Sequence, residues 1–258
     1  MFRSWGRLNA IIAIAVLCAG VQACSPRNQP SVITQCVLPD DQVKTLAGKW
    51  NALAVPIAFH GGDFTTDQIT AMLAAADTWN NFYAKSLGLY TIDYGNPVRV
   101  TAASYPKPSY SCGASLLNAA KTGYTGSVVI FKDMTWPTNF SAQAIAITTR
   151  CPVAAKPLNF FNYAFIEVNF QNFFSAGKQL PDLQSILLHE FGHLMGLEHS
   201  CEATQKAGYP YCNDPAIDGS YYDAVMYPVF KFSGGLGEQK RELRSNDQGR
   251  ANCLYDVN

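Results

Sequence analysis

The sequence is poor in histidine and in charged residues. Only four of its 258 residues are histidines, and aspartate, glutamate, lysine and arginine together make up 15%. Acidic and basic residues balance at 19 each, and no long basic run occurs. Proteins that bind nucleic acid usually carry a basic face, so we expect no nucleic-acid partner. The apolar share of 48% is that of a globular protein and argues against disorder.

An apolar run long enough to span a membrane is also missing. The longest candidate, residues 11–21, is too short to cross a bilayer as a helix, and two arginines precede it. This pattern is typical of an export signal, which we assign to residues 1–23. The tripeptide Val21-Gln22-Ala23 before Cys24 resembles a bacterial lipobox. We therefore expect lipidation at Cys24 and an outer-membrane or cell-surface lipoprotein, with a periplasmic or secreted protein as the alternative.

The rest of the chain divides into two parts. Residues 24–44 are polar and contain proline, so we expect a tether there. Residues 45–258 are enough for one hydrophobic core and contain no internal repeat. We predict a single folded domain in a monomer, with membrane contact only through the lipid anchor.

Eight cysteines are present, of which Cys18 lies in the export signal and Cys24 directly after it. Six remain, and an even number in an exported protein favours disulfides. Six cysteines allow many pairings, and the sequence cannot choose among them. Our prediction is Cys36 with Cys253, Cys112 with Cys151, and Cys201 with Cys212.

Three of the four histidines lie in the stretch HEFGHLMGLEHS, which begins at His189. Apolar residues at helical spacing predict a helix over its first part, so His189 and His193 lie one turn apart on one face. Glu190 then lies beside them. Gly196 can adopt the positive φ that ends a helix, which allows His199 to approach from outside it.

A catalytic zinc site explains this spacing better than a chance occurrence of the residues or a role in core packing does. Three neutral histidines leave the fourth tetrahedral position open, whereas structural zinc sites are closed by four protein ligands. Zinc lowers the pKa of its bound water to about 7, and a carboxylate within reach can accept the proton as that water attacks a carbonyl. We predict one zinc ion on His189, His193 and His199, with Glu190 as the general base of amide hydrolysis.

The same stretch resembles the zinc signature HExxHxxGxxH of the metzincin metallopeptidases, and Ser200 is the residue type that marks the matrixin branch. Asp223-Ala224-Val225-Met226-Tyr227-Pro228 resembles the Met-turn of that family, in which a methionine, here Met226, packs beneath the zinc. Ordinary core filling is the alternative for Met226. The resemblance implies a zinc endopeptidase that acts on proteins or peptides.

An α+β, zincin-type fold is implied for residues 45–258: a twisted, mostly parallel five-stranded sheet with an active-site helix, a backing helix and a C-terminal helix. A capping box from Thr65 to Gln68 predicts the start of the backing helix, and one from Ser245 to Gln248 predicts the start of the C-terminal helix. Strand patterns occur at residues 55–60, 90–94, 98–102, 127–131, 164–170 and, more weakly, 144–149.

Departures from the matrixin pattern leave alternatives open. Residues 200–222 are longer than the matching matrixin segment, and only His60 remains for a second zinc site, so we expect one zinc. Calcium is possible but not indicated, because oxygen ligands on loops leave no clear sequence mark. Cys36 begins a sequence, CVLPD, that faintly resembles the matrixin cysteine switch, in which a thiolate occupies the open zinc position.

Two other functions compete with the endopeptidase. A surface binding or adhesion protein could keep the zinc site without turnover, although an intact Glu190 argues against it. Zinc-dependent hydrolysis of a non-protein amide or ester is the third hypothesis, and a narrow closed pocket would support it.

The resemblance also implies that the segment after Pro228 lines the pocket for the substrate residue that follows the cleaved bond. Its apolar start predicts an apolar side chain there.

Overall fold

The computed structural model describes residues 32–107, 112, 128–153 and 158–255. The expected export signal and Cys24 lie outside these residues. The compact unit begins at Val32, within the range expected for the tether. Residues Asp40–Thr45 form a short 3-10 helix, η1, in which Gln42 is buried. None of the helices in the described part of the chain has the length and apolarity needed to cross a membrane.

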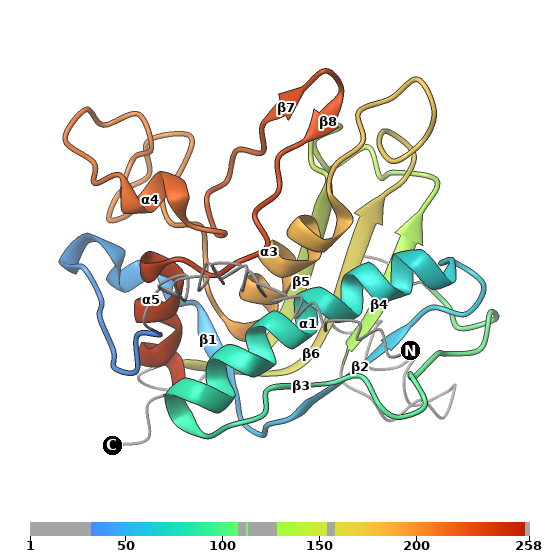
Figure 1. Ribbon diagram of the computed structural model, residues 1–258, viewed down its shortest axis with the longest axis horizontal. Coiled ribbons are helices and arrows are strands. Elements are labelled where there is room, and N and C mark those ends of the chain that lie inside the picture. The colour runs from blue at the N-terminus through green and yellow to red at the C-terminus, as the bar shows by residue number, and fades with distance from the viewer. Residues whose placement is uncertain (1–31, 108–111, 113–127, 154–157, 256–258) are drawn as a thin grey trace, which may run out of the picture. The chain divides into compact units, whose positions relative to one another are not determined.

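A mostly parallel six-stranded sheet forms one layer of the fold (Figure 1). Its strands lie in the order β1-β6-β4-β2-β3, and β5 pairs with β6 in the antiparallel direction. A separate two-stranded hairpin, β7–β8, follows later in the chain. The strands are β1 (Gly48–Trp50), β2 (Val55–Phe59), β3 (Ile92–Asp93), β4 (Val128–Asp133), β5 (Ala146–Val153), β6 (Asn159–Asn169), β7 (Phe232–Ser233) and β8 (Leu236–Gly237).

The strand predictions are confirmed with shifted ends, except the one at residues 98–102, which is wrong. That segment makes only an isolated bridge, between Val100 and Phe59, because β3 already occupies the start of the same edge of β2. Strand β1 was not predicted, since three residues that include a glycine are too short to show alternation. The sheet therefore has six strands rather than five.

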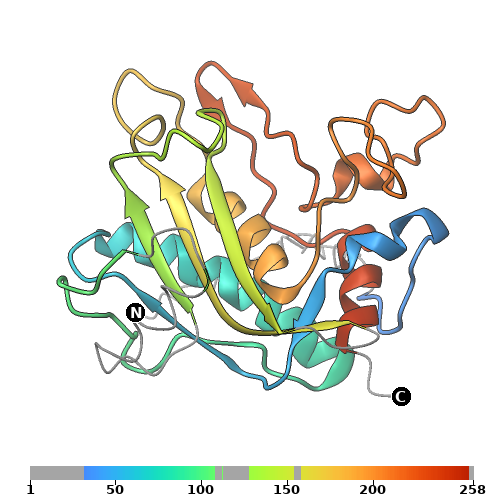
Figure 2. The same cartoon turned by 180° about the vertical axis from the view of Figure 1, so that it is seen from behind.

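The predicted helices are present, and the two long ones lie behind the strands when the molecule is seen as in Figure 2. The first begins with the predicted capping box, in which Thr65 and Gln68 each accept a hydrogen bond from the other's backbone N–H. The helix that carries His189 and His193 has Asp182 as its N-cap and Gly196, whose φ is 116°, as its C-cap. The helices are α1 (Thr66–Leu87), α3 (Leu183–Met195), α4 (Ser220–Asp223) and α5 (Ser245–Tyr255).

The predicted capping box of the last helix is wrong. Ser245 is the first residue of α5, and the Asp247 carboxylate accepts from the Arg244 N–H at 3.0 Å. The Gln248 side-chain amide donates instead to the Leu243 carbonyl oxygen. A charged acceptor makes a stronger hydrogen bond than a neutral one, so Asp247 takes the place that the sequence pattern had given to Gln248.

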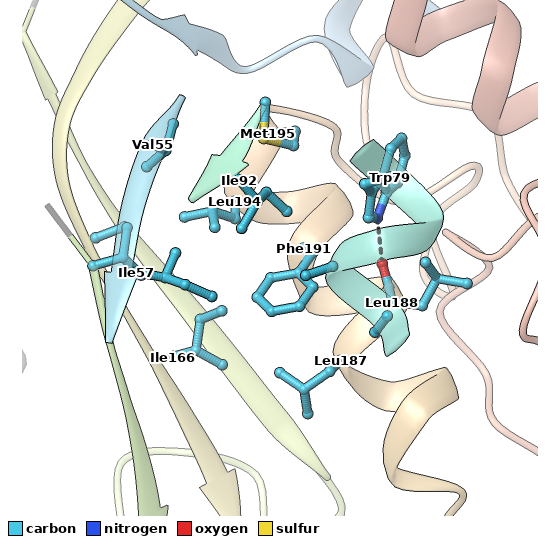
Figure 3. Close-up of a cluster of buried hydrophobic side chains, with 14 of the residues drawn as sticks. Val55, Ile57, Trp79, Ile92, Ile166, Leu187, Leu188, Phe191, Leu194 and Met195 are labelled. Carbon is cyan, nitrogen blue, oxygen red and sulfur yellow. Dashed lines mark hydrogen bonds between the residues drawn. The ribbon is translucent and has the colours of Figure 1, made fainter. Parts of the chain in front are cut away.

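The main core fills the space between the two long helices and the sheet. Phe191 of α3 packs toward Ile57 and Ile166 of the sheet (Figure 3). Trp79 of α1 is completely buried, and its indole N–H donates to the Leu188 carbonyl oxygen at 2.9 Å. Helix α3 is thus held by apolar contacts on one side and by α1 on the other, so it is a rigid support for the residues it carries.

The three predicted disulfides are present: Cys36–Cys253, Cys112–Cys151 and Cys201–Cys212. The first bonds the start of the folded unit to α5. Because Cys36 is bonded, it is not a free thiolate, and the cysteine-switch alternative is wrong.

Asn80 of α1 offers a test of this packing, because its side chain forms hydrogen bonds with the backbone at the start of β3. Its Oδ1 accepts from the N–H groups of Thr91 and Ile92, and its Nδ2 donates to the Ile92 carbonyl oxygen. Asn80→Ala leaves these buried groups unpaired, so we expect a loss of about 2–4 kcal/mol in the free energy of unfolding measured in urea. Asn81→Ala, on the exposed side of the same helix, is the control and should change it by less than about 0.5 kcal/mol. Equal effects of the two would contradict the described packing.

Candidate metal centre

The three predicted histidines converge on one point. His189 and His193 come from α3, and His199 comes from the turn that follows Gly196. One ring nitrogen of each lies within 4.8 Å of those of the other two, and the described residues contain no second group of this kind. The Nε2 atoms of His189 and His193 are 3.1 Å apart. His60 lies elsewhere, with its ring nitrogens 3.0 Å from Asp63 Oδ1 and from the Tyr105 carbonyl oxygen.

Backbone carbonyls fix the protonation of the two helical rings. His189 Nδ1 is 2.7 Å from the Val225 carbonyl oxygen, and His193 Nδ1 is 2.8 Å from that of Leu197. A carbonyl oxygen only accepts, so each Nδ1 carries the proton and each Nε2 presents a lone pair toward the other. Two facing lone pairs repel unless a cation lies between them, and histidine ligands of metals are oriented by such outer hydrogen bonds. This arrangement fits a metal ion.

The local electrostatics keep the rings neutral. Burial lowers the pKa of His189 to about 3, and the His199 ring and nearby cations add to the effect. Burial and nearby cations lower the pKa of His199 to about 4. The pKa of His193 is lowered well below its usual range for the same first reason. Neutral imidazole is the form that binds metals, so all three rings are ready ligands at neutral pH.

Glu190 is buried, with 5% of its surface exposed, and lines the same cleft as the histidines. Burial raises its pKa to about 7, while Thr148 and Arg150 act in the opposite direction. The Thr148 hydroxyl donates to Glu190 Oε2 at 2.6 Å. A nearby metal cation would favour the carboxylate form. Glu190 is therefore a buried carboxyl group that Thr148 holds in a fixed position beside the three histidines.

Arg150 of β5 links the edge of the sheet to the end of α3. Its guanidinium donates to the His193 carbonyl oxygen at 3.0 Å and to Glu198 Oε1 at 2.6 Å. A cation at the C-terminus of a helix meets the negative end of the helix dipole. Arg150 thus stabilises the turn that brings His199 to the other two histidines.

Met226 packs directly against the helix that carries the histidines. It is completely buried, and a Cβ added to Gly192 would lie 2.2 Å from its sulfur. The turn is held by Asp247, whose carboxylate accepts from the N–H groups of Val225 and Met226 at 2.8 and 3.1 Å. The close contact with Met226 therefore requires a glycine at position 192, between the two histidines of α3.

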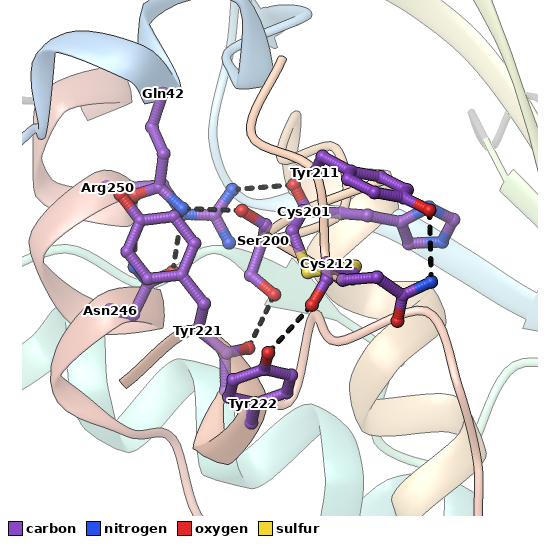
Figure 4. Close-up of a disulfide and its surroundings, with 12 residues drawn as sticks. Gln42, Ser200, Cys201, Tyr211, Cys212, Tyr221, Tyr222, Asn246 and Arg250 are labelled. Carbon is purple, nitrogen blue, oxygen red and sulfur yellow. Dashed lines mark hydrogen bonds between the residues drawn. A yellow bond between two sulfur atoms is a disulfide. The ribbon is translucent and has the colours of Figure 1, made fainter. Parts of the chain in front are cut away.

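The long segment after His199 is anchored by hydrogen bonds and a disulfide (Figure 4). The Ser200 hydroxyl donates to the Tyr221 carbonyl oxygen, and the Ser200 carbonyl oxygen accepts from the Gln42 side chain, both at 2.7 Å. The buried Cys201–Cys212 disulfide closes the segment beside them. The chain on the C-terminal side of His199 is thus fixed from two directions.

The histidines and Glu190 line a cleft of about 670 Å³. Strand β5 borders one side of it, with Ala146 to Thr148 and Arg150, and residues 227–230 border the other. β5 is paired only with β6 among the described strands, so its other edge faces this cleft.

Comparison with protein-family models and with curated proteins finds no match to this chain. Inferences about its function therefore depend on the geometry of the site.

Several residues of the site could not be predicted. Thr148 lies in a weak strand pattern and Arg150 directly follows it, and nothing in their local sequence relates them to α3. Asp247 lies in the first turn of a helix, where an acidic residue is common for reasons of the helix dipole alone. Only the fold brings these three residues to the histidines. Gly192 lies beside His193 in the sequence, but it occupies an unrestricted position of the signature, so its contact with Met226 could not be predicted.

A double-mutant cycle tests the packing of Met226 beneath the histidines. Gly192→Ala places a methyl group against Met226, so we expect it to reduce the free energy of unfolding by about 1–3 kcal/mol. In the Met226→Ala background the same change should be less damaging, because the space is empty. Gly219→Ala, where an added Cβ meets nothing within 4 Å, is the control. Additive effects of Gly192→Ala and Met226→Ala would contradict the contact.

Proposed function

We propose that this chain is an exported zinc-dependent endopeptidase of the metzincin type. The observation that carries the proposal is the convergence of three neutral imidazoles, two of them with inward-facing Nε2 lone pairs, beside a buried carboxylate in one cleft. Three nitrogen donors without a fourth protein ligand among the described residues are the donor set of catalytic rather than structural zinc.

The residues of the chain have distinct tasks in this mechanism. His189, His193 and His199 would hold the ion, and when bound it supplies a Lewis acid for the carbonyl and for the attacking water. Glu190 accepts the proton of that water and passes it to the leaving amine. Thr148 fixes the orientation of the carboxylate through its hydrogen bond to Oε2.

The shape of the site favours a peptide over a small amide. The free edge of β5 borders the cleft, and an extended peptide can add to such an edge through main-chain hydrogen bonds. A cleft with one strand edge as its wall suits a substrate that continues beyond both sides of the cleaved bond. This supports an endopeptidase over the hydrolase of non-protein amides or esters.

We also propose export and lipidation at Cys24, from the N-terminal sequence pattern. Three disulfides in a chain of this size support an oxidising compartment. A binding or adhesion protein is the alternative to the endopeptidase. Such a protein would need no buried general base beside the metal.

Cleavage of a denatured protein mixture by the mature protein tests the proposal. The unmodified protein should contain one zinc and cleave the mixture, with products read by mass spectrometry. Glu190→Gln should keep the zinc and lose about 10²–10⁴-fold in turnover, because only the general base is removed. His193→Ala should lose both zinc and turnover. Glu202→Gln, the same chemical change on the nearby loop, is the control and should behave as the unmodified protein does.

Zinc binding without any cleavage would contradict the endopeptidase and favour the binding protein. Full cleavage by Glu190→Gln would contradict the mechanism, even if the protein is a peptidase.

A further inference from the structure

The cleft continues from His189 toward the beginning of α3, where it meets a lysine. Ser185, one helical turn before His189, and Lys240, in the chain after β8, both line it. The Lys240 N–H donates to the Ser185 hydroxyl oxygen at 2.8 Å. Its ammonium group donates to the carbonyl oxygens of Tyr222 and Ala224, at 2.8 and 3.1 Å. Lys240 thus connects α3 to the segment just before the Met-turn.

The ammonium of Lys240 has no acidic partner in the described part of the chain. None of the ion pairs found there includes it, and Glu238, Asp247 and Asp223 act on it only at longer range. An ammonium has three N–H donors, and the two carbonyls use two of them. The ammonium also lies 5.0 Å from the centre of the Tyr227 ring. A positive charge without a directly bonded carboxylate therefore lines this part of the cleft.

The walls between His189 and Lys240 are mainly apolar. They include Ile186 of α3 and, on the opposite side, Val225, Pro228 and Phe230. A ligand that fits this part of the cleft has an apolar stem and a negatively charged end. Among amino-acid side chains, that description fits glutamate best and aspartate next.

Resting on the proposed endopeptidase function, we propose that Lys240 is a specificity-determining residue. It makes this part of the cleft accept an acidic side chain, glutamate above all, on the substrate residue that follows the cleaved bond. This differs from the apolar preference that the sequence after Pro228 predicts.

The electrostatics of the cleft favour this occupant. A charge pair that is partly removed from water interacts more strongly than one on the surface, and Lys240 is already partly buried in the cleft. Burial lowers the pKa of Lys240, and an arriving carboxylate would oppose that shift. A neutral side chain of the same shape gains neither effect, so the selectivity should be visible between glutamate and glutamine.

Peptides that differ only in the residue after the cleaved bond test the proposal. We expect the unmodified protein to cleave the glutamate peptide with a kcat/KM at least ten-fold above that of the glutamine and leucine peptides. Lys240→Met keeps the length of the side chain and removes the charge, so this ratio should fall to one or below. Lys240→Arg should keep it. Lys231→Met, an exposed lysine outside the cleft, is the control and should leave the ratio unchanged.

A preference of the unmodified protein for leucine, or an unchanged ratio in Lys240→Met, would overturn the role of Lys240 and leave the endopeptidase standing. Absence of cleavage of all the peptides and of the denatured protein mixture would overturn both. If Lys240→Met does not fold, Lys240→Gln and the glutamate-to-glutamine ratio of the unmodified protein decide the question.

Discussion

The Nε2 atoms of His189 and His193 face each other across 3.1 Å, and much of the surrounding structure keeps them there. Two neutral imidazoles would normally turn away from such an approach. Here each ring is held by a hydrogen bond from Nδ1 to a backbone carbonyl, of Val225 in one case and of Leu197 in the other. Those two carbonyls belong to the Met-turn and to the turn after α3, so the site depends on both turns.

Buried charges hold these turns in place. Asp247 accepts from the backbone of the Met-turn and from Arg244. Arg250, also completely buried, donates to Thr45 and to the Glu198 carbonyl oxygen. Arg150 reaches the same turn from β5. Removing one member of such a network leaves another charge buried without its partner, which is costly. The network therefore connects α5, η1 and the sheet edge to the geometry of the histidines.

Local patterns predicted what local interactions determine. The spacing of His189 and His193 follows from helical geometry, the capping box at Thr65 from hydrogen bonds within one turn, and the helix end at Gly196 from its positive φ. The same reasoning failed at Ser245, where Asp247 forms the backbone hydrogen bond instead, and missed β1, which gains its order by pairing with β6, more than a hundred residues away.

Thr148 and Lys240 could not be predicted from sequence patterns, because their contacts in the cleft are also made with residues far away in the chain. Thr148 contacts Glu190 across 42 residues, and Lys240 contacts Ser185 across 55. Neither lies in a motif, and each acts only through a partner brought to it by the sheet or by the turn after β8. The candidate metal ligands can thus be predicted from the sequence, whereas the surroundings of Glu190 and the lining of the cleft depend on the fold.

X-ray absorption at the zinc edge, on protein purified without added metal and then loaded with one equivalent of zinc, tests whether the three histidines hold the ion. We expect three imidazole nitrogens near 2.0–2.1 Å with a further light-atom ligand and no sulfur. Because all six cysteines of the folded unit are paired in disulfides, zinc–sulfur scattering at about 2.3 Å would contradict it. So would a zinc environment that is unchanged in His193→Ala.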